Sequence, residues 1–302
     1  MANRWWIYQR ERFPLVMHGP LVVVFCLAVM LFSSLQQVAG FPGLANLSAA
    51  VISTLLLFFQ LRVADEFKDF AIDSAYRPHR AVPRGLVSLA ELGKLAWAAA
   101  AIQLLIAAYL DIGLVPLLFA VWAYMGLMTR EFFVKDWLVK HPTVYLLSHM
   151  LVMPMIAFYV SAFDWLSHCR AVPSGLGWLL GLSFCSGLVL ELGRKVRLPA
   201  NERPGVETYS ALWGVRTAVC VWTAALIASL ITYAVAQSYL GLPLTGLLPG
   251  AFAALFGFAT AFLLLQKSNT ANSTGEKFIE PCSGLVALAL YLGLGPLQAA
   301  IA

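Results

Sequence analysis

Long apolar runs recur along the chain and limit what it can fold into. Several of them contain eighteen or more residues, enough for a helix to cross the roughly 30 Å hydrocarbon core of a bilayer. The segment 21–32 is apolar on all sides, and 95–110 is interrupted only by Gln103, whereas strands of a membrane barrel alternate apolar and polar residues. The chain is therefore predicted to be an all-α polytopic membrane protein.

Composition supports this prediction and excludes other classes. Hydrophobic residues make up 61% of the 302 residues and charged residues 12%, against about 45–50% and about 25% in an ordinary soluble domain. The apolar runs use most of the chain, so we expect one integral membrane domain, residues 1–302. The five cysteines are widely scattered, and this pattern predicts neither a disulfide framework nor a thiolate metal site.

The hydropathy pattern predicts nine membrane-spanning helices in one bundle. Their expected ranges are 15–38, 44–64, 92–110, 112–128, 144–163, 173–192, 210–237, 246–266 and 279–299. If the N-terminal segment 1–14 is cytoplasmic, nineteen of the twenty basic residues fall on the inner side and only Arg170 lies outside. The positive-inside rule therefore predicts a multi-pass protein with a cytoplasmic N-terminus, in the inner membrane if the source is bacterial.

A first charged cluster follows the second predicted span. Asp65, Asp69 and Asp73 are spaced four residues apart, which places them on one face of a helix that continues out of the span. Like charges at this spacing repel one another unless a cation lies among them. Mg²⁺ is a suitable cation, because it binds one or two carboxylates together with substrate phosphates.

Basic residues accompany these carboxylates. Arg77, Arg80 and Arg84 follow in a loop that Pro83 and Gly85 keep from continuing as a helix, and the planar guanidinium group suits phosphate oxygens. The first cluster therefore predicts a Mg²⁺–diphosphate site. The competing interpretation is a solvated loop in which acidic and basic side chains neutralise one another.

A second charged cluster follows the sixth predicted span. Glu191 lies at the end of an apolar helix, where an ionisable group is costly and is a functional candidate. Arg194, Lys195 and Arg197 come directly after it and are a second set of cations suited to phosphate. Contact with anionic lipid headgroups is the alternative for this stretch. The two clusters are four spans apart, so they can face one another as two halves of one site.

The residues of the first cluster resemble a signature of the UbiA superfamily of intramembrane prenyltransferases. The family pattern Asn-Asp-x-x-Asp-x-x-x-Asp is similar in spacing to Asp65-Glu66-x-x-Asp69-x-x-x-Asp73, with two replacements. The family segment Arg-Pro-x-Arg-Pro-x-Pro-x-Gly-x-x-Ser is similar to the segment from Arg77 to Ser88, with Ala81 in place of one proline. The resemblance extends over essentially the whole chain and implies a bundle around a central cavity, capped by charged cytoplasmic loops after helices 2 and 6.

The second family signature is altered in this chain. Where family members carry an Asp-rich motif, Glu191 takes the place of the leading polar ligand and Lys195 falls near the position of an expected aspartate. The resemblance implies that a lysine here neutralises phosphate charge in place of part of a second Mg²⁺. The number of metal ions and the use of a conventional acceptor are left open by this change.

The resemblance and the charged patterns together assign roles to individual residues. The predicted catalytic residues are Asp65, Asp69, Asp73, Glu191 and Lys195, and the predicted Mg²⁺ ligands are Glu66, Asp69, Asp73 and Glu191. The predicted diphosphate-binding residues are Arg62, Lys68, Arg77, Arg80, Arg84, Arg130, Arg194 and Arg197, and the predicted pocket residues are Tyr76, Tyr124, His149 and Tyr209. For His149, a packing role inside its span is an alternative to an acceptor-orienting role.

These roles lead to an expected activity. The resemblance implies a Mg²⁺-dependent enzyme that ionises an allylic prenyl diphosphate and transfers the prenyl group to a small, aromatic acceptor. The alternative within the same superfamily is a membrane terpene cyclase, in which the allylic cation closes on its own double bonds. A transporter or lipid-binding protein is disfavoured, because charges on a transport route also occur at mid-membrane. The expected partners are prenyl diphosphate, the acceptor and membrane lipids, without nucleic acid.

Overall fold

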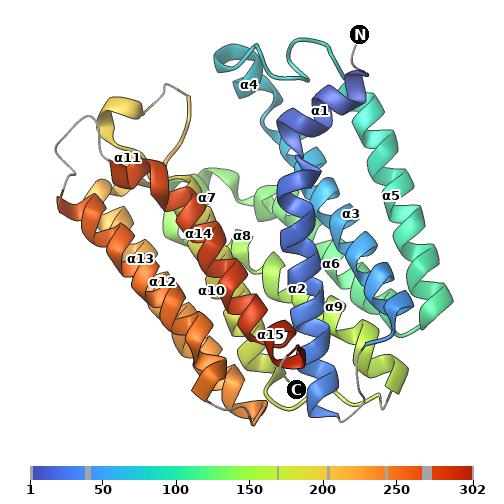
Figure 1. Cartoon of the computed structure of the whole chain (residues 1–302). Coiled ribbons are helices and arrows are strands. Elements are labelled where there is room, and N and C mark those ends of the chain that lie inside the picture. Colours follow the sequence, from blue (N-terminus) through green and yellow to red (C-terminus); the bar gives the residue numbers. More distant parts are fainter. Residues whose placement is uncertain are drawn as a thin grey trace.

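The computed structural model describes residues 3–37, 42–168, 170–202, 205–241, 244–266 and 274–300. Within these ranges the regular structure is entirely helical (Figure 1). The predicted end of the first span, at residue 38, lies outside the described residues. The all-α class predicted from the apolar runs is thus confirmed for the described part of the chain.

The long helices form a closed ring in chain order. The members of the ring are α2 (Leu15–Gln36), α3 (Leu44–Lys68), α5 (Leu89–Leu110), α6 (Leu114–Thr129), α9 (Val152–His168), α10 (Leu176–Arg194), α12 (Val215–Tyr239), α13 (Leu248–Gln266) and α14 (Thr274–Gly293). Each packs against the next along the chain, and α14 closes the ring by packing against α2. This order brings α3 and α10, which end in the two charged clusters, to well-separated positions in the ring.

In the part of the chain that the structure describes, seven helices are long and apolar enough to cross a membrane. They are α2, α3, α5, α10, α12, α13 and the α8–α9 pair, in which α8 (Pro142–Met150) precedes α9. Of the nine predicted spans, α6 is shorter, with 16 residues, and α14 begins with a charged turn that contains Glu276, Lys277 and Glu280. The prediction of nine spans by length and hydropathy is therefore met only in part, although each predicted range contains a helix.

Two interruptions in the helices have local causes. Helix α8 ends at Met150 and α9 begins at Val152, and Pro154 explains this break, because its ring collides with the carbonyl group four residues earlier. Helix α3 ends at Lys68, and α4 (Phe70–Tyr76) begins after Asp69. The expectation that one helix carries all three aspartates is corrected: they follow one another at one-turn spacing across a break.

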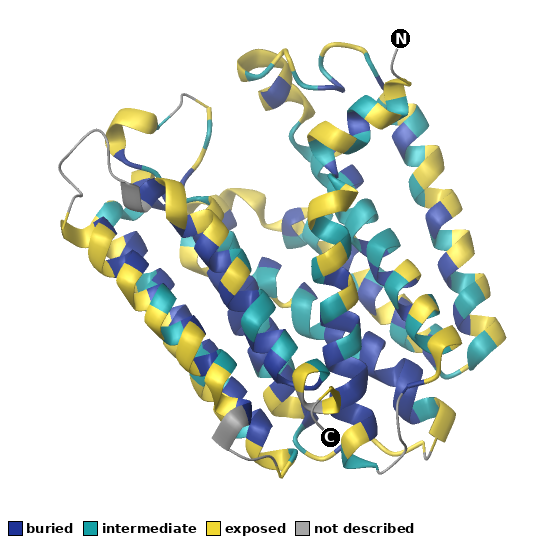
Figure 2. Ribbon diagram, viewed as in Figure 1, coloured by how far each residue is buried: buried dark blue, intermediate teal, exposed yellow. Residues whose placement is uncertain are grey.

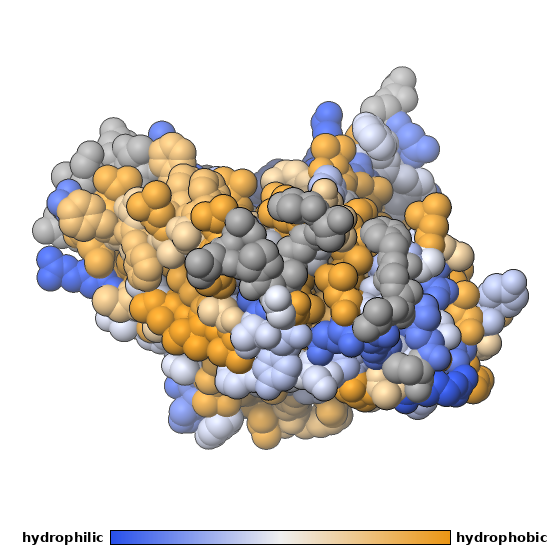
Figure 3. Space-filling model, turned by 60° about the horizontal axis from the view of Figure 1, so that its bottom comes forward, coloured by the Kyte–Doolittle hydropathy of each residue, from blue (hydrophilic) through white to orange (hydrophobic). Residues whose placement is uncertain are grey.

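The outer surface is apolar, as expected for contact with lipid. Trp97, Leu105 and Tyr109 of α5 are 80%, 69% and 88% exposed, and Leu255 and Phe262 of α13 are also exposed. Figure 2 shows exposed positions along the outer helices and buried positions in the middle of the bundle, and Figure 3 shows apolar residues over large areas. An integral, multi-pass membrane protein is the class that this surface fits.

Short helices and loops cover one end of the ring. They include α1 (Arg4–Arg12), α4 and α11 (Tyr209–Trp213), which lie at the same end in Figure 1. The connection from α4 to α5 ends in a capping box, in which Ser88 accepts from the backbone of Glu91 and Glu91 accepts from the backbone of Ser88. Such a cap fixes where α5 begins, and so holds the arginine-rich loop before it.

Candidate active site

Asp73 is the centre of the first charged cluster. Its side chain is almost completely buried, at 1% exposure of the residue. One carboxylate oxygen lies 2.7 Å from Arg77 and the other lies 2.5 Å from Arg80 and 3.8 Å from Arg12. Three guanidinium groups thus surround one carboxylate, and the group as a whole keeps a positive charge.

Three further acidic residues extend this cluster. Glu66, which is 2% exposed, accepts a hydrogen bond of 2.5 Å from Nε of Arg12. Asp65 lies 3.4 Å from Arg62, one turn earlier in α3. Asp69, at the break between α3 and α4, is half-buried. The predicted residues of the first motif are thereby brought together at the end of α3.

The second cluster lies at the end of α10. Glu191 pairs with Arg194 at 2.5 Å and with Lys195 at 2.9 Å. The ammonium group of Lys195 also lies 5.5 Å from the centre of the Tyr209 ring, a cation–π contact. Arg197 is directed elsewhere, with its guanidinium 3.6 Å from Glu280.

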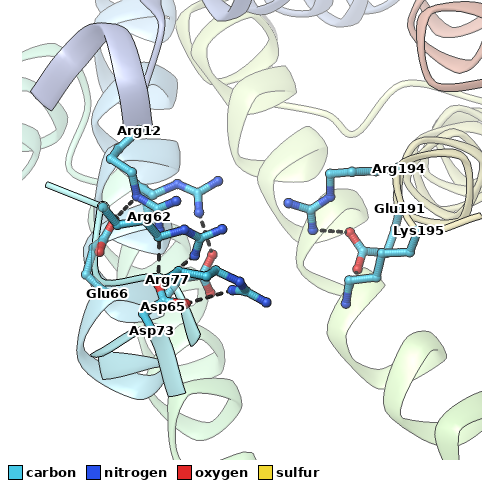
Figure 4. A network of polar contacts seen from close by, with 10 residues as sticks. Arg12, Arg62, Asp65, Glu66, Asp73, Arg77, Glu191, Arg194 and Lys195 are labelled. Atoms are coloured by element: carbon cyan, nitrogen blue, oxygen red, sulfur yellow. Dashed lines mark hydrogen bonds and ion pairs between the residues drawn. The ribbon is translucent and has the colours of Figure 1, made fainter. Parts of the chain in front are cut away.

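The two clusters face one another. In Figure 4 the two clusters lie on opposite sides of a gap, and Arg77 of the first cluster and Glu191, Arg194 and Lys195 of the second extend toward it. Asp65 and Arg194, one from each cluster, interact electrostatically. The two halves of the site predicted from the sequence therefore lie on opposite sides of one gap.

The loops above the clusters also touch. Arg77 donates a hydrogen bond of 3.2 Å to the carbonyl oxygen of Gly205. Gly205 has a φ of 72°, and a side chain at this position would meet the ring of Tyr76. Glycine satisfies both requirements, because it tolerates positive φ and has no Cβ. Tyr76 and Arg77 thus connect the first cluster to the loop that follows the second.

A third group of polar residues lies beside the first cluster. Lys68 donates to Glu131 at 2.5 Å and to the Tyr145 hydroxyl at 2.5 Å. Nε2 of His149 lies 3.3 Å from the other carboxylate oxygen of Glu131, and the rings of Tyr145 and His149 stack at 3.9 Å. The ammonium of Lys68, predicted to bind diphosphate, is engaged by this network. His149 Nδ1 also lies 2.8 Å from the Tyr145 carbonyl oxygen, which can only accept.

A strained turn holds Glu131 in this network. Glu131, Phe132 and Phe133 have φ values of 49°, 51° and 60°, in the left-handed region that non-glycine residues seldom adopt. Burial raises the pKa of Glu131, but its contacts with His149 and Lys68 have the larger effect and lower the pKa to about 2. The ionised carboxylate therefore stabilises a turn that costs free energy on its own.

The stabilising effect of Glu131 should depend on pH. The pKa of Glu131 is about 2 in the folded protein, and an ordinary glutamate has a pKa of 4.5. The contribution of Glu131 to stability is therefore complete above pH 4.5 and is lost as the pH falls toward 2. The size of the contribution is about 3 kcal/mol. We expect the thermal unfolding midpoint of wild type in detergent to fall more steeply between pH 4.5 and pH 2.5 than that of Glu131→Gln. Equal slopes in the two proteins would contradict this assignment.

The remaining predicted residues occupy varied positions. Arg84 binds the carbonyl oxygen of His79 and the carboxylate of Glu11, and so anchors α1. Arg130 is exposed at the end of α6. The Tyr124 hydroxyl donates to the carbonyl of Ser148 at 2.5 Å, and its ring meets Phe132 edge to face. These three residues lie outside the facing pair of clusters.

The carboxylate groups of the two clusters are better suited to hold one divalent cation than several. Among the described residues, no group of three or more His, Cys, Asp and Glu side chains is arranged to hold a metal ion. Glu66, Asp73 and Glu191 are each engaged by at least one arginine or lysine. Asp65, whose contact with Arg62 is longer at 3.4 Å, lies one turn from Asp69, and two carboxylates with substrate phosphates are a usual environment for Mg²⁺.

Two residues of the site were missed by sequence reasoning. Arg12 belongs to the N-terminal helix, outside both charged motifs of the sequence, and Glu131 follows the fourth predicted span. Their positions depend on tertiary contacts: Arg12 is 54 residues from its partner Glu66 in sequence, and Glu131 is 63 residues from its partner Lys68. An acidic residue directly after Arg130 was the one local signal for Glu131.

Comparisons with known proteins bear on the fold. No protein-family model and no curated protein sequence matches the chain. Among solved structures, it is similar to an apo UbiA homologue from Aeropyrum pernix K1, with a TM-score of 0.70, 17% identity, and coverage of 93% of this chain and 98% of the other. It is also similar to a digeranylgeranylglyceryl phosphate synthase, with a TM-score of 0.63, 12% identity and coverage of 97% and 99%. At these identities the likeness establishes a shared fold.

Proposed function

Because the chain has the fold of the UbiA superfamily, we propose that it is an intramembrane prenyltransferase. It ionises an allylic prenyl diphosphate and transfers the prenyl group to a small, aromatic acceptor. The charged clusters and the N-terminus lie on the cytoplasmic side in this proposal, because the basic residues gather there.

The observation that carries the proposal is the facing pair of clusters. Arg12, Arg77 and Arg80 carry one positive charge more than Glu66 and Asp73, the carboxylates that they surround. Arg62 and Asp65 neutralise one another, and the charge of Asp69 is the one that a bound Mg²⁺ would offset. The group of Arg194 and Lys195 around Glu191 has the same excess. Two cationic groups on opposite sides of one gap suit a ligand with two linked phosphates.

These residues can promote loss of diphosphate. Guanidinium and ammonium groups bind phosphate oxygens and stabilise the negative charge that develops as the allylic C–O bond breaks. The loops that meet at Arg77 and Gly205 would limit the access of water, which would otherwise convert the allylic cation to an alcohol. The ring of Tyr209, buried beside Lys195, presents an aromatic face that can stabilise a cation.

The apolar bundle provides for the rest of the substrate. Its interior is lined by aliphatic and aromatic side chains, a suitable environment for an isoprenoid tail. Asp65 and Asp69 are the residues that would hold Mg²⁺. When bound, this ion supplies Lewis-acid stabilisation of the leaving diphosphate.

Purified protein with Mg²⁺ tests the proposal. Geranyl, farnesyl and geranylgeranyl diphosphate would be supplied with and without 4-hydroxybenzoate as a probe acceptor, and both pyrophosphate release and products would be measured. We expect release from at least one diphosphate, and a fall of about 10²-fold or more in Asp65→Asn, which alters the carboxylate beside the leaving group. Asp136→Asn, at an exposed position, is the matched control.

The products separate the alternatives. Release that requires an aromatic acceptor supports the transferase, whereas release without an acceptor together with a cyclic hydrocarbon would replace it with the terpene cyclase. Mass spectrometry of lipid extracts from expressing cells extends the search to acceptors that were not supplied. Absence of pyrophosphate release from every diphosphate, with unaltered extracts, would overturn the proposal.

A further inference from the structure

Most of the carboxylates that the sequence predicts as Mg²⁺ ligands already form ion pairs with arginine or lysine side chains. Glu66 and Asp73 are 2% and 1% exposed. Their carboxylate groups form ion pairs with arginine side chains. A divalent cation at either residue would have to displace a guanidinium group from a buried ion pair. Removing one partner of such a pair is strongly unfavourable.

The same arrangement occurs at the second cluster. One oxygen of Glu191 binds Arg194 and the other binds Lys195, so both oxygens of the carboxylate are in use. Lys195 is held in place by the Tyr209 ring, and the Tyr209 backbone N–H donates to the Lys195 carbonyl at 3.1 Å. The lysine is therefore fixed at the position where an aspartate was expected.

Arg12 reaches the first cluster because α1 is anchored around it. Tyr8 of α1 is buried in a small core with Val63, Ala81, Val82, Val87 and Leu92. Ion pairs join Arg4 to Glu91 at 2.6 Å and Glu11 to Arg84 at 2.9 Å. The Arg12 side chain, only 11% exposed, then lies between Glu66 and Asp73. The N-terminal helix is thus a structural part of the site.

We propose that Arg12, Arg194 and Lys195 are resident cations that replace divalent metal ions at Glu66, Asp73 and Glu191 and bind phosphate oxygens directly. This inference rests on the proposed function for the identity of the ligand as a diphosphate. An arginine can do both, because its five donors exceed those that the carboxylates use. The site then binds no more than one divalent cation, at Asp65 and Asp69, because the Arg62 contact of Asp65 is longer, at 3.4 Å, and the Asp65 side chain is half exposed.

Metal stoichiometry tests the first part of the inference. The full chain in detergent would be dialysed to equilibrium against Mn²⁺ and inorganic pyrophosphate, and the Mn²⁺ bound per chain measured as the excess on the protein side. We expect no more than one Mn²⁺ per chain, and the same number in Glu191→Gln. The double variant Arg194→Gln/Lys195→Asp places two carboxylates one turn apart without their cations and is expected to bind one Mn²⁺ more. Arg216→Asp, which introduces a carboxylate at an exposed position, should not.

Pyrophosphate binding without metal tests the second part. In EDTA, calorimetry should detect pyrophosphate binding to wild type, weakened roughly tenfold or more in Arg12→Gln and in Lys195→Gln by the loss of a charge-assisted hydrogen bond. Arg12→Lys keeps the charge and should recover part of the affinity, which distinguishes a binding role from a purely structural one. Arg216→Gln should bind as wild type does.

The outcomes distinguish this inference from the proposed function. Two Mn²⁺ ions per wild-type chain, with one lost in Glu191→Gln, would overturn the inference, as would the absence of pyrophosphate binding in EDTA. If the binding results hold but no prenyl diphosphate is cleaved, the proposed function is wrong and the resident cations remain.

Discussion

Asp73→Asn is expected to destabilise the protein by about 3–5 kcal/mol and to eliminate measurable pyrophosphate release. The magnitude is that of removing one partner from a buried ion pair. Asparagine retains the shape of the side chain but leaves Arg12, Arg77 and Arg80 without the charge that holds them together. Their repulsion would open the first cluster, and the cations would no longer be aligned on the diphosphate. The unfolding midpoint in detergent and pyrophosphate release are the measurements.

Asp136→Asn is the control for this prediction. Asp136 lies in α7 (Lys135–Lys140) and is exposed, so the same chemical change should alter stability by less than about 0.5 kcal/mol. If Asp73→Asn unfolded at the same temperature as the control, the three arginines would not depend on this carboxylate. Retained activity in a stable Asp73→Asn protein would remove the first cluster from the proposed site.

The ring of helices was largely predictable from the sequence, because burial in lipid requires long apolar segments. Each predicted range contains a helix, and the order along the chain is also the order around the ring. Helix ends were less predictable. The break at Asp69 interrupts a segment whose aspartates have a helical spacing, and their spacing alone contains no signal for it.

The candidate site was predictable only where its charges are close in sequence. Asp73, Arg77 and Arg80 fall within one turn or two of one another, and the local pattern predicted that they act together. The sequence could not predict that Arg12 would join them, since this depends on how Tyr8 packs. Nor could it predict the left-handed turn at Glu131, because a strained backbone is held by tertiary contacts rather than by local preference.

The second cluster depends on a close contact between α10 and α14. Gly193 lies between Glu191 and Arg194, and a Cβ at this position would lie 2.9 Å from the Cβ of Ser283 and 3.3 Å from the backbone oxygen of Ile279. Ser283 also accepts a hydrogen bond of 3.0 Å from the buried indole of Trp222 in α12. Gly193 thus allows three helices to meet directly below the charged residues.

Gly193→Ala is therefore expected to destabilise the protein by about 1–3 kcal/mol, the usual cost of overpacking. The added methyl group would push Ser283 away, weaken its bond to Trp222 and shift the end of α10 that carries the second cluster. We expect pyrophosphate release to fall together with the unfolding midpoint. The reason is geometric, because no charged group is changed.

Gly177→Ala in the same helix is the matched comparison. A Cβ at Gly177 has no neighbouring atom within 4 Å, and Gly177 lies in the first turn of α10, so alanine should be neutral there or slightly stabilising. Opposite signs for the two substitutions would show that the contact at Gly193, rather than the flexibility of glycine, controls the position of Glu191 and Lys195. Equal effects on stability and on pyrophosphate release would instead mean that α14 can move away without disturbing the second cluster.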